Sequence, residues 1–105
     1  MLAVAEVAHT HADRRRGLLG RDRVDGALVL RPCRQVHTFG MRCPVDVLWC
    51  DRRGKVLRMA TLPPRRISRP VLRARFVIEA GAGAARSWEV RPGDVLTVEA
   101  GSRDA

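Results

Sequence analysis

Short apolar runs, separated by residues that favour turns, are the main pattern along this chain. Runs of this length with few polar interruptions are typical of β-strands. The pattern predicts strands over residues 2–8, 27–30, 45–50, 55–62, 75–79 and 95–99. Helix is expected in only two short segments, residues 13–19, preceded by Thr10 as the N-cap, and residues 82–88.

The turns between these runs complete the predicted fold. Asp51-Arg52-Arg53-Gly54 lies between two runs, and Gly54 can adopt the positive φ that a tight hairpin turn requires. Several short strands joined by turns predict a mainly β fold, a compact sandwich or barrel of the jelly-roll kind with one or two short helices. At 105 residues, we expect one domain spanning residues 1–105.

Composition adds an expectation about location. No apolar run approaches the roughly 20 residues of a membrane-spanning helix, and residues 1–8 lack the basic start of a signal peptide. The cysteines Cys33, Cys43 and Cys50 are odd in number and form no CxxC pair, as expected for reduced thiols. These features predict a cytoplasmic protein without a membrane span.

The excess positive charge belongs to one segment. The net charge is +9, and residues 52–78 hold nine basic residues and no acidic one. Such a segment is either a solvated basic loop or a weak binding site for polyanions. Phe76 is the only aromatic residue near the centre of the segment, so no platform for stacking bases is evident. We therefore expect nucleic-acid binding to be at most weak, nonspecific and sensitive to salt.

Asp46 is unusual because it lies within an apolar strand. On a pleated strand it shares a face with Leu48 and Cys50, and either face could be core. A buried carboxylate needs partners, and the candidates are Arg14, Arg21 and the amides of residues 37–41. Asp46 is thus either a structural anchor or a residue of a functional site.

Other combinations of reactive residues are weaker. The spacing of Cys33, His37, Met41 and Cys43 matches no standard zinc pattern, so we expect no metal and no cofactor. A nucleophilic pair of Cys43 and His37 lacks a third group to orient it. The glycine-rich residues 81–85 follow a strand as a dinucleotide-binding turn would, but too little chain follows them to complete that fold.

Motifs in a characteristic order give the chain a resemblance to a known family. They are R-x-x-G-L-L-G-R over 14–21, H-T-F-G-M-R-x-P-x-D-V-L over 37–48, D-x-x-G-x-V over 51–56, V-I-E-A-G over 77–81 and P-G-D over 92–94. The chain resembles the prokaryotic domain of unknown function 192, whose name records that no activity is established. The resemblance implies a mainly β fold and recurrent residues at Arg14, Arg21, His37, Met41, Asp46, Glu79 and Asp94. Residues 27–30 and Cys43 depart from the family pattern, and the departure at Cys43 weakens any thiol or metal chemistry there.

Three functions follow from these observations. The first is a small binding or accessory module for a small molecule or a protein, with a groove near His37, Met41 and Asp46. The second is a small hydrolase or transferase in which His37 and Asp46 act as base and orienting group. The third is a weak polyanion binder that uses residues 52–78. The candidate ligand-binding residues are Arg14, Arg21, His37, Met41, Asp46 and Glu79.

Overall fold

The structure is a computed structural model. It describes the backbone of residues 5–8 and both backbone and side chains of residues 27–96. The helix expected over residues 13–19 lies outside the described residues, as does most of the strand expected over 95–99.

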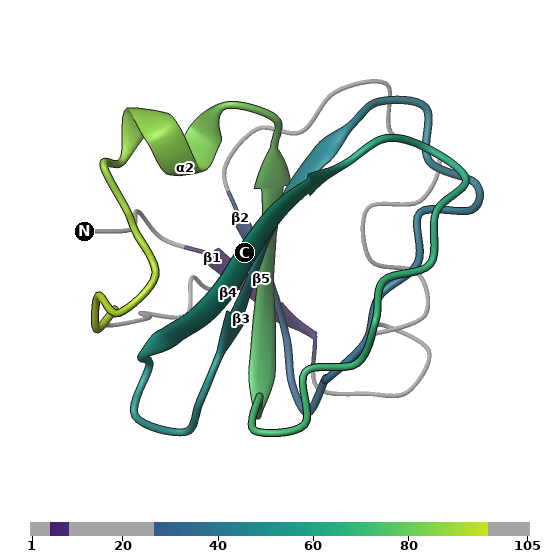
Figure 1. The fold of residues 1–105 in the computed structure, drawn as a ribbon. Helices are drawn as coiled ribbons and strands as arrows, with labels where there is room; N and C mark the ends of the chain where they lie inside the picture. Colours follow the sequence, from purple (N-terminus) through teal and green to yellow (C-terminus); the bar gives the residue numbers. More distant parts are fainter. Residues whose placement is uncertain (1–4, 9–26, 97–105) are drawn as a thin grey trace, which may run out of the picture.

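One five-stranded sheet forms the centre of the protein (Figure 1). Its strands, named in chain order, are β1 (Ala5–Ala8), β2 (Ala27–Leu30), β3 (Val45–Cys50), β4 (Val56–Leu62) and β5 (Phe76–Gly81). Their order across the sheet is β1-β2-β5-β3-β4. The β1–β2 pair is parallel, and the other three pairs are antiparallel. A short helix, α2 (Ala84–Ser87), follows β5.

The predicted fold class is confirmed. The protein is mainly β, and the helical turn expected over residues 82–88 is α2. Strands β2 and β3 have the predicted bounds, and the other expected strands agree within a few residues. In the described part of the chain the sheet stays open, with β1 and β4 as its edges, so no barrel closes. Val95 forms an isolated bridge with Lys55.

Both faces of the two central strands are buried. Every residue of β3 is buried, and so is every residue of β5 before Gly81. This explains their nearly continuous hydrophobic sequences, because a strand covered on both faces needs apolar side chains at odd and even positions. The first face carries Val29, Leu48, Cys50, Val56, Phe76, Ile78, Ala85, Val90 and Leu96. The second carries Leu28, Leu30, Val36, Met41, Val45, Val47, Trp49, Ala74 and Val77.

Different segments of the chain cover the two faces of the sheet. The first face packs against α2 and the residues that follow it, which contribute Ala85, Val90 and Leu96. The second face is covered by two long connections, residues 33–44 and 63–75, which we call the paired loops. Figure 1 shows them running side by side beyond the sheet. Backbone hydrogen bonds join the two loops along their length. At one end the Thr38 amide donates to the Arg66 carbonyl at 2.7 Å, and at the other the Cys33 amide donates to the Arg75 carbonyl at 3.2 Å.

The predicted turn at residues 51–54 is confirmed by its hydrogen bonds. The Asp51 carboxylate accepts from the amides of Arg53 and Lys55, and Gly54 has a φ of 86°. The Gly54 backbone also lies against the chain beyond α2, since the Leu96 amide donates to the Gly54 carbonyl at 2.9 Å. A Cβ atom at position 54 would collide with the Leu96 carbonyl oxygen.

We predict that Gly54→Ala is markedly destabilising. An alanine at this position would adopt a left-handed conformation, which disfavours a side chain, and its Cβ would collide with the Leu96 backbone. Together these effects should lower the free energy of unfolding by about 2–4 kcal/mol. Gly93→Ala is the matched control because Gly93 has a φ of 97° and open space where its Cβ would lie. Its cost should be about 1 kcal/mol. Urea unfolding measures both variants, and equal losses would contradict the role of the contact with Leu96.

Candidate functional site

Asp46 holds the start of α2. Its side chain is only 5% exposed and projects from β3 on the first face of the sheet. One carboxylate oxygen accepts from the Thr61 hydroxyl at 2.7 Å, and the other accepts from the amides of Gly83 and Ala85, both at 3.0 Å. The carboxylate therefore satisfies two backbone donors at the start of α2, of which the Ala85 amide is buried.

Of the partners expected for Asp46, only the amides of residues 37–41 lie among the described residues. Arg14 and Arg21 lie outside the described residues, and the amides of residues 37–41 do not contact Asp46. The reason is the alternation of side chains along β3. Asp46 shares its face with Leu48 and Cys50, which α2 covers, whereas the loop that carries His37 covers the opposite face.

Met41 and His37 have different surroundings. Met41 is buried in the second cluster, where it packs as a core residue. His37 is exposed, and its backbone forms a bridge with Ile67 in the facing loop. The His37 ring also lies 6.0 Å from the ring of Phe39, measured between centroids. Of these two candidates, His37 is therefore the one that a ligand could reach.

Thr38, which the sequence analysis missed, joins the two paired loops. Its hydroxyl donates to the Pro63 carbonyl at 2.7 Å and accepts from the Arg66 amide at 2.8 Å. The side chain is buried although both of its chain neighbours are exposed. A small polar residue between exposed neighbours gives no sequence signal, because its partners are about 25 residues away in the chain.

His37 lies at a cavity of about 590 Å³ on the second face of the sheet. The cavity is bounded by the ends of β2 and β5 and by the paired loops. Its lining residues are Leu30, Pro32, Cys33, Arg34, Gln35, Val36, His37, Ala74, Arg75 and Glu79. The volume is within the range of small-molecule binding sites.

Glu79 is the buried ionisable group of this cavity. It lies on the central strand β5, with Leu28 opposite it on one side and Val47 on the other. Its side chain is 6% exposed, and burial raises its pKa from 4.5 to about 7. Burial is the cause of this shift, and among residues 27–96 no hydrogen bond or ion pair to the carboxylate is seen. No fully enclosed side-chain oxygen in this part of the chain lacks a partner, so the Glu79 oxygens remain accessible from the cavity.

The structure thus separates His37 from Asp46 and places it with Glu79. Asp46 lines a different cavity, of about 980 Å³, between β3, β4 and α2. Both Asp46 oxygens are already hydrogen-bonded there, so the residue has little capacity left for a ligand. An acidic residue at the end of the predicted strand 75–79 marks Glu79 as unusual in the sequence. The cavity that it lines is formed by the paired loops and is not visible in the sequence.

Other reactive groups give little support to a catalytic centre. Cys50 is buried in the first cluster, and burial raises its pKa to about 12, so its thiol is a poor nucleophile. Among residues 27–96, no three His, Cys, Asp or Glu side chains are grouped so that they could hold a metal ion. In the same part of the chain, no helix is long and apolar enough to cross a membrane.

We predict that the role of Asp46 is structural and depends on its acceptor oxygens. Asp46→Ala leaves the Gly83 and Ala85 amides without an acceptor and should lower the free energy of unfolding by about 2–4 kcal/mol. Asp46→Asn keeps one carbonyl oxygen for these amides and should cost about 1 kcal/mol. Chemical denaturation of the two variants tests this difference, and equal costs would show that the hydrogen bonds to α2 contribute little.

The sequence of this chain is similar to a known protein family and to individual proteins over most of its length. Residues 2–98 match the model of the family DUF192, described as an uncharacterized conserved family. A UPF0127 protein of Thermococcus gammatolerans is 34% identical over 98 residues, which cover 88% of this chain and 64% of the relative. A UPF0127 protein of Thermococcus kodakarensis is 32% identical, covering 88% and 62%. This chain therefore spans a little under two thirds of the length of these relatives.

Solved structures share the fold at lower sequence identity. A protein of unknown function from Novosphingobium aromaticivorans has a TM-score of 0.77 at 20% identity, covering 87% of this chain and 71% of the other. A protein from Sinorhizobium meliloti, described as a "putative transcription regulator", has a TM-score of 0.76 at 22% identity, covering 89% and 79%. The family match over nearly the whole chain confirms the resemblance seen in the motifs, and the chain belongs to the DUF192 family.

Proposed function

We propose that this protein is a binding module whose ligand-binding site is the cavity above Glu79. The observation that carries the proposal is a carboxylate that belongs to a buried side chain, lines a cavity and has no hydrogen-bond donor in the described part of the chain. A buried carboxylate without donors costs free energy, and a ligand that supplies an N–H group would remove that cost. An ammonium group is the strongest donor of this kind, because it also carries a compensating charge.

The rest of the cavity favours a ligand with an apolar body and an anionic end. Leu30, Val36 and Ala74 contribute apolar lining, whereas Arg34 and Arg75 place guanidinium groups at the exposed margin. Residues 75 and 79 share one face of an extended chain, about 13 Å apart at roughly 3.3 Å per residue. A simple cation would be repelled by the two arginines. A molecule with an amine at one end and an anion at the other suits both ends of the cavity.

The alternative of a hydrolase or transferase has less support. It requires His37 and Asp46 to act together, and these residues line different cavities on opposite faces of the sheet. The proposed setting is the cytoplasm, on the basis of the low and odd number of cysteines. The protein would then act as a binding or accessory component in the handling of a small organic molecule.

The buried state of Glu79 predicts a pH-dependent loss of stability. Below pH 4.5 both the folded and the unfolded chain carry the Glu79 proton. Between pH 4.5 and about 7 the unfolded chain loses this proton while the folded chain keeps it, so stability falls as the pH rises. The total loss is about 3 kcal/mol and is complete above pH 7.

Glu79→Gln should abolish this loss. The difference in unfolding free energy between the variant and the wild type should therefore grow from pH 4.5 to about 7 in favour of the variant and then level off. Urea denaturation at a series of pH values measures it, and the other titrating groups cancel in the difference. A difference that does not change with pH would contradict the burial of an unpaired carboxyl group.

Ligand binding itself is tested with three probes of similar length, 6-aminohexanoate, hexylamine and hexanoate. Titrations followed by amide chemical shifts should show the tightest binding for 6-aminohexanoate, with shifts at residues that line the Glu79 cavity. Glu79→Gln should weaken the two amine probes about tenfold and leave hexanoate unchanged. Arg75→Gln should weaken the two carboxylate probes instead.

Arg91→Gln is the control, since it removes the same charge as Arg75→Gln but lies at the other cavity. It should change no probe affinity. Binding of the amines that is insensitive to Glu79→Gln, or shifts confined to the α2 side of the sheet, would overturn the proposed site.

A further inference from the structure

An array of exposed arginines follows one of the paired loops. Arg65, Arg66, Arg69 and Arg73 are all exposed. In the part of the chain that the structure describes, none of these guanidinium groups forms an ion pair with a carboxylate. Surface arginines are commonly neutralised by acidic neighbours, so a series that lacks them presents a concentrated positive potential.

The loop that carries these arginines is held in place by the facing loop. The Ser68 amide donates to the Val36 carbonyl at 2.9 Å, and the Val71 amide donates to the Arg34 carbonyl at 2.9 Å. The Ser68 hydroxyl accepts from the Val36 amide at 3.0 Å. The backbone positions of the charges are therefore fixed, which lowers the entropy lost when an anion binds.

Pairing of the loops brings aromatic rings to this charged segment. Thr38 forms hydrogen bonds with Arg66, and the residues on either side of Thr38 are His37 and Phe39. The Phe39 side chain is 48% exposed, and its ring lies 6.0 Å from that of His37. The sequence showed no stacking platform, because these rings are more than 25 residues away from the arginines along the chain.

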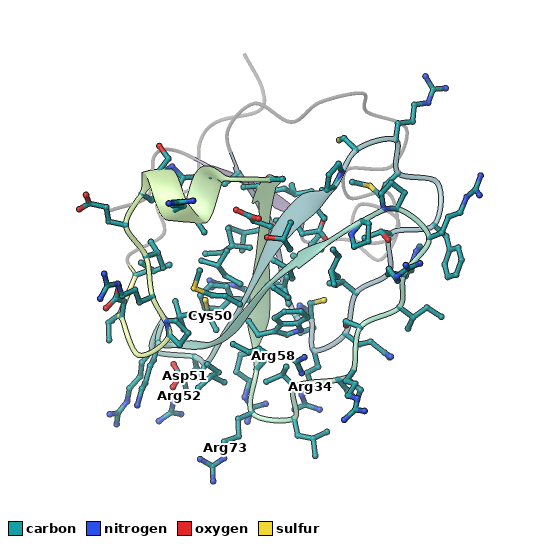
Figure 2. All side chains as sticks on the ribbon, turned by 45° about the horizontal axis from the view of Figure 1, so that its top comes forward. Arg34, Cys50, Asp51, Arg52, Arg58 and Arg73 are labelled. Atoms are coloured by element: carbon teal, nitrogen blue, oxygen red, sulfur yellow. The ribbon has the colours of Figure 1, made fainter. Side chains whose placement is uncertain are left out.

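The positive surface extends to the end of the sheet away from α2. Figure 2 shows Arg34, Arg52, Arg58 and Arg73 at this end. Contacts support the arrangement: the Arg58 guanidinium lies over the Trp49 ring at 5.6 Å, and the Trp49 indole N–H donates to the Arg34 carbonyl at 3.0 Å. We call the exposed arginines of the loop, together with those at this end of the sheet, the arginine track.

We infer that this track binds single-stranded nucleic acid, with the phosphates on Arg65, Arg66 and Arg69 and an unpaired base stacked on Phe39. A row of cations beside an exposed ring is the arrangement that recognises single strands, because the backbone supplies a line of charges and every base offers a flat face. A duplex keeps its bases stacked inside and cannot use the ring. Arg65, Arg66, Arg69 and Phe39 do not line the Glu79 cavity, so the inference does not depend on the proposed ligand.

Fluorescence anisotropy with labelled dT12 and rU12 at 50 mM salt tests the inference. We expect both strands to bind, and a 12-base-pair duplex to bind more weakly. Phe39→Leu keeps an apolar side chain but removes the ring, and it should weaken single-strand binding at least about fivefold. The double substitution Arg66→Gln with Arg69→Gln should reduce the slope of log K against log salt by about 1.4, since each lost phosphate contact contributes about 0.7.

The double substitution Arg86→Gln with Arg91→Gln is the matched control. It removes the same net charge on the α2 side of the protein and should leave the salt slope unchanged. Thermal melts establish that each variant is folded. The inference is overturned if the duplex binds as tightly as the single strands, if Phe39→Leu binds like wild type, or if the control and loop variants lose affinity equally. Binding to anionic vesicles without binding to either oligonucleotide would instead identify a membrane surface as the partner and reject the inference.

Discussion

Burial of both faces of β3 and β5 is the constraint on which the rest of the structure depends. A polar side chain on either strand enters an apolar layer, whichever way it points, and must find partners there. Asp46 and Glu79 meet this requirement differently. Asp46 points to the first face and receives three hydrogen bonds, one from Thr61 and two from backbone amides at the start of α2. Glu79 points to the second face and opens on a cavity. The first carboxylate stabilises the start of α2, and the second is the group to which we assign the proposed ligand.

Much of the fold could be predicted from local patterns. The apolar runs at β2 and β3, the turn around Gly54 and the helical turn after β5 all depend on short-range preferences, and all are observed. The order of strands in the sheet and the separation of His37 from Asp46 could not be predicted. Both depend on which face each side chain enters and on which distant segment covers that face. The alternation along β3 indicated two faces, but only the packing of α2 and the paired loops shows what lies on each.

The paired loops explain why the candidate site was only partly visible in the sequence. His37 and Glu79 were both candidates, yet nothing in the sequence indicated that they share a cavity. Likewise, the basic segment looked like a solvated loop without aromatic neighbours. Hydrogen bonds between residues 33–38 and 65–75 bring the backbone next to Phe39 against the loop that carries the arginines, and residues of both loops line the cavity. Both proposed binding surfaces, the cavity and the arginine track, therefore depend on one long-range pairing that includes the buried Thr38.

Glu79 is a buried carboxyl group for which residues 27–96 supply no donor, and the proposed binding site depends on this state. The most direct measurement is the titration of the Glu79 side-chain carboxyl carbon by NMR, in protein labelled with carbon-13 at glutamate and assigned with Glu79→Gln. We expect a midpoint at about pH 7, well above the ordinary pKa of 4.5, because burial disfavours the charged carboxylate. A midpoint at or below 4.5 would show that the carboxylate is solvated or already paired with a cation, and would contradict the assignment of this cavity as a site that awaits a donor.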